Sequence, residues 1–205
     1  MVPFDRFAVV LDACTMFPML VRDVLLTLAA HEFFSPKWSP RIRDEWTRNL
    51  IARMRERDDD VIARTKVERI AAAVEAAFPD ALVTADLPES PILDPVDAKD
   101  RHVVVTAMVA QADAIVTFNL ADFAASHLSE KLQIEVIHPD DFVMDLVDLN
   151  EKRAVAAFRE LRARKKNLVD ACRITPKSGH SLLRIGYADA NKGPVTGRLC
   201  RVRKS

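Results

Sequence analysis

The chain has 205 residues, 49% of them hydrophobic, and its 30 Lys and Arg residues balance 30 Asp and Glu residues. This size and composition predict a globular protein with one domain of ordinary size. No apolar run approaches the roughly 18 residues that a membrane span needs, which excludes a membrane protein. The start of the chain lacks a secretory pattern and the three cysteines are widely spaced, so we expect free thiols and a cytoplasmic protein.

The charge is divided unevenly along the chain. Residues 1–150 carry 15 Lys and Arg against 26 Asp and Glu, a net charge of −11, whereas residues 151–205 carry 15 against 4, a net charge of +11. All four glycines lie in the last 27 residues. We therefore predict an acidic domain over residues 1–150 and a basic C-terminal extension over residues 151–205.

Strand-like and helical patterns alternate along the first 150 residues. The first predicted strand, residues 7–11, ends at Asp12, and a second lies within residues 32–38, before the helix start marked by Ser39 and Pro40. The later predictions are a helix at about 59–77, a short strand at 82–83, a loop at 86–95, a helix at about 103–111, a strand at 114–118, an edge strand at 133–137 and one or two helices between 142 and 166. This alternation predicts a parallel sheet with helices on both sides.

Acidic side chains gather in the segment 94–123. Asp97 and Asp100 come just before a helical run, and Asn119 ends the strand that follows, with Asp122 three residues later. The first turn of a helix favours carboxylates electrostatically. Ligands of open α/β sheets lie beyond the carboxyl ends of the strands. We therefore expect these four side chains to converge on one site, although each could also be an ordinary cap or turn residue.

Asp12 is a further strand-end candidate, because it directly follows the first predicted strand. The same position is typical of a residue that caps the next helix, and both interpretations stay open. A strand, an Asp and a helix start also occur in haloacid-dehalogenase phosphatases. Those enzymes need a second Asp two residues later, where this chain has Cys14, so we set that interpretation aside.

Two other polar residues have plain structural interpretations. Glu45 borders the apolar stripe of its helix, and its spacing favours a salt bridge to Arg41 or Arg48. His102 follows the acidic segment and is interpreted as a polar residue on a helix surface, without a catalytic role.

Four segments occur in an order that is characteristic of one family. They are LDACTMFP at 11–18, SPRIRDEWTRNL at 39–50, DAKDRHVVVTAMVAQADAIVTFNLADF at 97–123 and IEVIHPDDF at 134–142. Together they resemble PIN-domain nucleases of the VapC toxin type over about residues 7–150. The resemblance implies a three-layer α/β/α fold and a metal-dependent endoribonuclease that acts as the toxin of a type II toxin–antitoxin pair. It also implies RNA as substrate, a small antitoxin protein as partner and a homodimer.

The resemblance also implies roles for particular residues. The catalytic carboxylates would be Asp12, Glu45, Asp100 and Asp122, of which the three aspartates would bind Mg²⁺ or Mn²⁺, with Asp97, Thr117 and Asn119 supporting them. Clustered carboxylates raise each other's pKa values unless a cation lies among them, and oxygen ligands select Mg²⁺ or Mn²⁺ over Zn²⁺. The chemistry of the residues therefore gives a second reason to expect a metal.

Two other functions stay open at this stage. Many relatives have Asp where this chain has Asn119, which is compatible with a catalytically weak RNA-binding or scaffold protein. The third function is an RNA-processing nuclease outside a toxin system. Because all four expected carboxylates are present, the sequence favours an active enzyme over a scaffold.

The basic extension is predicted to be helical to about residue 167 and irregular from about residue 173. We expect RNA binding by four of its basic residues, Arg162, Arg164, Lys165 and Lys166. Each phosphate that such a residue neutralises would add affinity that falls with salt. The alternative partner is the acidic surface of the protein itself or of a dimer mate.

Overall fold

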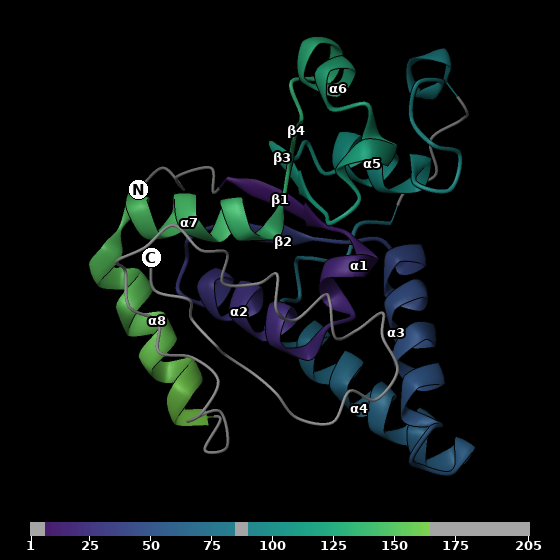
Figure 1. The fold of residues 1–205 in the computed structure, drawn as a ribbon, viewed down its shortest axis with the longest axis vertical. Coiled ribbons are helices and arrows are strands. Elements are labelled where there is room, and N and C mark those ends of the chain that lie inside the picture. Colours follow the sequence, from purple (N-terminus) through teal and green to yellow (C-terminus); the bar gives the residue numbers. More distant parts are fainter. Residues whose placement is uncertain (1–6, 85–89, 165–205) are drawn as a thin grey trace, which may run out of the picture.

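The chain folds around a four-stranded parallel sheet (Figure 1). A computed structural model describes residues 7–84 and 90–164. The strands are β1 (Ala8–Leu11), β2 (Ser35–Lys37), β3 (Ala114–Val116) and β4 (Glu135–Ile137), and their order in the sheet is β2–β1–β3–β4. The short strand predicted at 82–83 is reduced to a single parallel bridge between Trp38 and Leu82.

Helices lie on both sides of this sheet. They are α1 (Ala13–Met16), α2 (Met19–Ala30), α3 (Pro40–Met54), α4 (Asp60–Ala77), α5 (Arg101–Val109), α6 (Ala125–Leu132), α7 (Pro139–Leu149) and α8 (Glu151–Arg164), with 3-10 turns η1 (Pro91–Leu93) and η2 (Leu120–Phe123). The chain leaves β1 toward β2 and later passes through β3 to β4 in the opposite direction. Right-handed connections then place α2 and α5 on opposite faces, as Figure 1 shows. The predicted three-layer α/β/α fold is confirmed.

The two central strands are buried on both faces. Val9, Val10 and Leu11 of β1 and Ala114, Ile115 and Val116 of β3 have no exposed surface. A parallel strand covered by helices on both faces needs a continuous apolar run without polar alternation, which both segments have. The edge strand β4 is more exposed. The central strands therefore fix the positions of the residues that follow them.

The helical start of the extension belongs to the same core. Helix α8 packs against α2 and α7, and Ala154, Ala157 and Leu161 are buried in the common hydrophobic cluster. The Arg153 guanidinium lies 4.3 Å from the centre of the Phe33 ring. The predicted helix is thus present as far as the structure describes it, to residue 164. The irregular tail falls outside the described residues, and the boundary at residue 150 stays a prediction.

Within residues 7–84 and 90–164, no helix is both long and apolar enough to cross a membrane.

Candidate active site

Asp12 and Thr117 meet at the carboxyl ends of the two central strands. The Asp12 backbone N–H donates to the Val116 carbonyl at 3.1 Å, and Thr117 Oγ1 donates to Asp12 Oδ2 at 2.6 Å. Both residues are buried. Connections leave β1 and β3 in opposite directions at this point, and open α/β sheets bind their ligands at such a point.

Cys14 completes the hydrogen-bonded group around Asp12. Its Sγ donates to Asp12 Oδ2 at 3.0 Å and accepts from the Phe118 backbone N–H at 3.3 Å. Burial and, after it, the negative charge of Asp12 raise the pKa of the Cys14 thiol well above its usual value, so the thiol keeps its proton. The Asp12 side chain makes no capping hydrogen bond with α1. Asp12 therefore occupies the N-cap position of α1, but its side chain is engaged by Thr117 and Cys14 instead of the helix.

Asp100 lies among other carboxylates at the start of α5. Burial raises its pKa to about 6, together with the negative charges of, in decreasing order, Asp12, Asp122, Asp97 and Glu45. The Asp100 side chain makes no capping hydrogen bond with α5. Mutual effects of this kind require the charges to share one region. The structure thus brings the five acidic candidates together at the carboxyl end of the sheet, and we call this region the acidic edge.

The supporting candidates connect the loops of the acidic edge. The Asp97 backbone N–H donates to the Asp122 carbonyl at 2.9 Å, which ties the turn before α5 to η2. Asp97 Oδ1 also accepts from the Lys99 backbone N–H at 2.9 Å, so its side chain has a turn role as well. The Asn119 backbone N–H donates to Thr117 Oγ1 at 3.0 Å, and its side chain does not cap η2.

Glu45 reaches the acidic edge from α3. Its Oε1 accepts from Arg41 Nε at 3.3 Å, as the salt-bridge interpretation predicted, and also lies 3.2 Å from His102 Nε2. The His102 side chain is only 10% exposed, so its interpretation as a helix-surface residue is wrong. Burial and then the charge of Arg41 lower the pKa of His102 to about 4, which leaves the ring neutral at pH 7. Sequence spacing gave no sign of this contact between α3 and α5.

The side-chain oxygens of the acidic edge decide whether it fits a metal ion. In the part of the chain that the structure describes, no three Asp, Glu, His or Cys side chains form a ready metal cage. Asp12, Asp100 and Asp122 nevertheless supply hard oxygen donors, and their repulsion contributes to the raised pKa of Asp100. A divalent cation would remove that repulsion, and such donors suit Mg²⁺ or Mn²⁺. The residues therefore fit a divalent ion.

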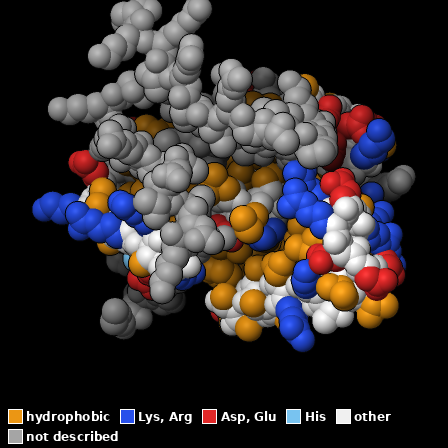
Figure 2. Space-filling view, turned by 60° about the horizontal axis from the view of Figure 1, so that its bottom comes forward, with side chains coloured by type: hydrophobic (Ala, Val, Ile, Leu, Met, Phe, Trp, Pro, Cys, Tyr) orange, Lys and Arg blue, Asp and Glu red, His pale blue; other side chains and the backbone are white. Residues whose placement is uncertain are grey.

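The predicted RNA-binding residues lie on another part of the molecule. Arg162 and Arg164 are exposed on α8, and Arg164 also donates to Thr27 Oγ1 at 2.7 Å. Figure 1 shows α8 at the opposite side of the molecule from α5, and Figure 2 shows basic side chains protruding on that side. Lys165 and Lys166 lie outside the described residues. The structure thus does not bring this group together with the acidic edge.

The fold and the acidic edge define a three-layer α/β/α protein with carboxylates gathered at the carboxyl end of a parallel sheet. Residues 8–121 match the model of the PIN domain, and residues 139–168 match that of the VapC50 C-terminal domain. The first match covers more than half of the chain. The chain therefore belongs to the PIN-domain family, as the sequence motifs indicated.

One curated relative carries the name "Putative ribonuclease VapC50" and comes from Mycobacterium tuberculosis (strain ATCC 25618 / H37Rv). The two proteins are 40% identical over 85 residues, which is 42% of this chain and 46% of the relative. The match thus spans about half the length of that relative. No solved structure is significantly similar to this chain.

Proposed function

We propose that this protein is a metal-dependent endoribonuclease that hydrolyses RNA phosphodiester bonds, and that it acts as the toxin of a type II toxin–antitoxin pair. The observation that carries the proposal is the raised pKa of Asp100 among four other carboxylates at the acidic edge. Perturbed groups of this kind cluster at functional sites, because a fold alone gains nothing from their repulsion. Membership of the PIN family and the ribonuclease name of the relative support the substrate class.

In this proposal Asp12, Asp100 and Asp122 hold Mg²⁺ or Mn²⁺. A bound ion of this type supplies hydroxide from water and offsets the charge that grows on the scissile phosphate. Thr117 and Cys14 orient the Asp12 carboxylate through the hydrogen bonds at 2.6 and 3.0 Å.

The remaining residues of the acidic edge orient the reacting groups. Glu45 approaches from α3, opposite the start of α5, and we assign it the positioning of the attacking water and acceptance of its proton. Asp97 links the loop before α5 to Asp122 through the backbone bond of 2.9 Å. Asn119 would supply a neutral oxygen to the metal or its water, where a carboxylate would add further repulsion.

The basic residues at the end of α8 and just after it in the sequence would bind the RNA backbone. We assign this role to Arg162, Arg164, Lys165 and Lys166. Arg162 and Arg164 are exposed on α8, which suits a contact with an extended strand that also reaches the acidic edge. The helix itself is fixed by Leu161 and its neighbours in the core.

An antitoxin would act by neutralising the acidic edge. An Arg side chain from a small partner protein would pair with its carboxylates in a bidentate arrangement and occupy the place of the metal. We further propose that the toxin forms a homodimer and acts in the cytoplasm. A growth test of the gene with and without its neighbouring reading frame examines this role, and expression that leaves growth unchanged would contradict it.

Asn119 favours a second candidate, a catalytically weak RNA-binding protein. The experiment that separates the two incubates purified protein with RNA and Mg²⁺ or Mn²⁺ and sequences the new RNA ends. The nuclease proposal predicts discrete ends with the wild-type protein and none with Asp100→Asn. If both proteins produced the same RNA ends, the acidic edge would not be the active site. RNA binding without new RNA ends would favour the second candidate.

A further inference from the structure

The contact between Glu45 and His102 joins two separate elements across the acidic edge. Glu45 lies on α3 and His102 on α5, one residue beyond the start of that helix. The distance from Glu45 Oε1 to His102 Nε2 is 3.2 Å. Asp100, two residues before His102, is one of the groups whose charge interacts with Glu45. The contact therefore sets how far Glu45 lies from the start of α5.

The two partners of Glu45 differ in how firmly they are held. The Arg41 side chain is 60% exposed, whereas the His102 side chain is 10% exposed. An exposed guanidinium on a flexible side chain holds its partner weakly, because solvent and salt screen the pair. Solvent and salt therefore screen the His102 contact less than the Arg41 pair.

The second ring nitrogen of His102, Nδ1, indicates that this residue has a role other than packing. His102 Nδ1 is buried and makes no hydrogen bond within the described part of the chain. A buried polar atom without a partner lowers stability, so an apolar side chain would pack here at less cost. A ring that faces a carboxylate through Nε2 carries its proton on Nε2, and Nδ1 is then an acceptor without a donor.

We propose that His102 is a positioning residue that donates a hydrogen bond from Nε2 to Glu45 and so holds the Glu45 carboxylate in the active site. This role deepens the proposed nuclease function and rests on it. His102 itself touches neither the metal nor the RNA in this scheme. Its effect on the reaction passes through the orientation of Glu45.

The contact can be tested without any measurement of activity. Nitrogen-15 NMR of the histidine rings should show His102 as the Nε2–H tautomer, with slow exchange of that proton. Glu45→Ala should accelerate the exchange, because the acceptor is removed. An Nδ1–H tautomer, or exchange that does not respond to Glu45→Ala, would overturn the proposal whether or not the protein cleaves RNA.

The role is tested by a pair of substitutions measured in single-turnover cleavage. In histidine, Nε2 lies further from Cβ than Nδ1 does. The longer side chain of Gln can place an amide N–H at the position of Nε2, whereas the shorter side chain of Asn cannot. His102→Asn should slow cleavage about tenfold, the effect of removing a hydrogen bond to a charged group. His102→Gln should recover most of that rate. Equal rates for the two variants would show that the donor is not needed.

Two further variants separate positioning from folding. In a Glu45→Ala background, His102→Asn should add little, because the residue it positions is gone; a further tenfold loss there would overturn the proposal. His31→Asn is the matched control, since His31 Nε2 pairs with Glu160 Oε2 at 2.8 Å between α2 and α8, away from the site. It should lower the melting temperature and leave cleavage unchanged. Absence of cleavage by the wild-type protein would overturn the nuclease function alone, since the NMR result still decides the contact.

Discussion

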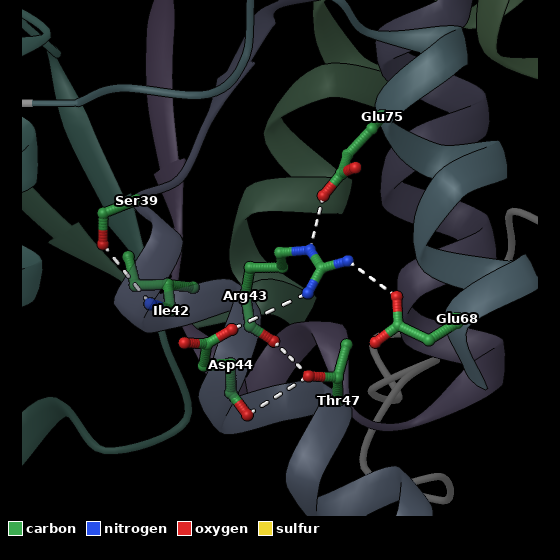
Figure 3. Close-up of polar contacts among 7 residues, drawn as sticks. All are labelled: Ser39, Ile42, Arg43, Asp44, Thr47, Glu68 and Glu75. Carbon is green, nitrogen blue, oxygen red and sulfur yellow. Dashed lines mark hydrogen bonds and ion pairs between the residues drawn. The ribbon is translucent and has the colours of Figure 1, made fainter. Parts of the chain in front are cut away.

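Helix α3 contributes to two regions in which charge is arranged in opposite ways. At its interface with α4, Arg43 Nε donates to Glu75 Oε1 at 2.5 Å and Arg43 Nη2 donates to Glu68 Oε2 at 2.9 Å (Figure 3). Burial lowers the pKa of Arg43, but its hydrogen bonds to Glu75 and Glu68 outweigh that effect and raise it. The charge of Arg43 at this interface therefore has opposite charges beside it.

Glu45, two residues further along α3, enters the acidic edge. There the neighbours of Asp100 named above are four carboxylates, and burial adds to their repulsion. Figure 2 shows acidic and basic side chains intermingled on the surface over α3 and α4; among the ion pairs of α4 are those of Lys66 with Asp58 and of Arg64 with Asp60. Compensated charge connects two helices, whereas uncompensated charge prepares a site for a cation.

The largest expected difference between the two regions is in catalysis. Asp100→Asn and Asp12→Asn should each lower RNA cleavage on the order of a hundredfold or more, because electrostatic stabilisation at the reacting phosphate is removed. Arg43→Ala should leave the rate of the folded protein unchanged. Single-turnover assays with matched amounts of folded protein measure both effects, and full turnover by Asp100→Asn would show that the site is misassigned.

RNA affinity should respond to the basic group at α8. Changing Arg162, Arg164, Lys165 and Lys166 to Ala should lower the slope of log affinity against log salt by about 0.7 for each phosphate of single-stranded RNA that is no longer neutralised. Truncation after Asp170 should leave the protein folded and cleavage intact. Binding titrations across a salt series provide the measurement, and an unchanged slope, or unfolding on truncation, would contradict the assignment.

Stability should depend on pH through Asp100. Its pKa rises from an ordinary value of 3.8 in the unfolded chain to about 6 in the folded protein, so the folded state binds the proton more tightly. The free energy of unfolding therefore falls as pH rises from about 4 through 6. Above pH 6, Asp100 causes no further loss. Asp100→Asn should be more stable than the wild-type protein at pH 8, and the two proteins should be equally stable near pH 4. Urea unfolding at the two pH values measures the difference in their free energies of unfolding. A difference that does not change with pH would contradict the raised pKa of Asp100.

The smallest effect should come from the compensated region. Arg43→Ala should lower the free energy of unfolding by about 1 kcal/mol, because the Arg43 pairs are partly exposed. Arg48→Ala, an exposed position on the same helix, is the matched control and should change stability less. Urea unfolding at pH 7 compares the two variants, and equal stabilities would mean that the Arg43 network contributes nothing measurable.

The fold was predictable because its signals are local. Continuous apolar runs predicted the central strands. Ser39 was predicted to cap α3, and its Oγ accepts from the Ile42 backbone N–H at 3.3 Å. The segment at 82–83 failed as a strand because a single bridge to Trp38 is its only ladder pairing among the described residues. Propensity cannot supply the pairing partner that an edge segment needs.

The acidic edge was predictable only in part. Asp12 and Asp100 stand at a strand end and a helix start, which a sequence reveals. The contributions of Cys14 and His102 depend on side chains far away in the chain, since Cys14 meets Phe118 and His102 meets Glu45. Such contacts leave no periodicity or spacing to detect, and both residues were therefore given plain interpretations.

The clustered carboxylates of the acidic edge should bind a divalent cation. Thermal melting at pH 8 with increasing Mn²⁺ tests this binding most directly in the wild-type protein and in Asp100→Asn. We predict that Mn²⁺ stabilises the wild-type protein, by about 2.7 kcal/mol at a hundred times the Kd, and stabilises Asp100→Asn much less. An equal response to Mn²⁺ in both proteins, or none in the wild-type protein, would contradict the account.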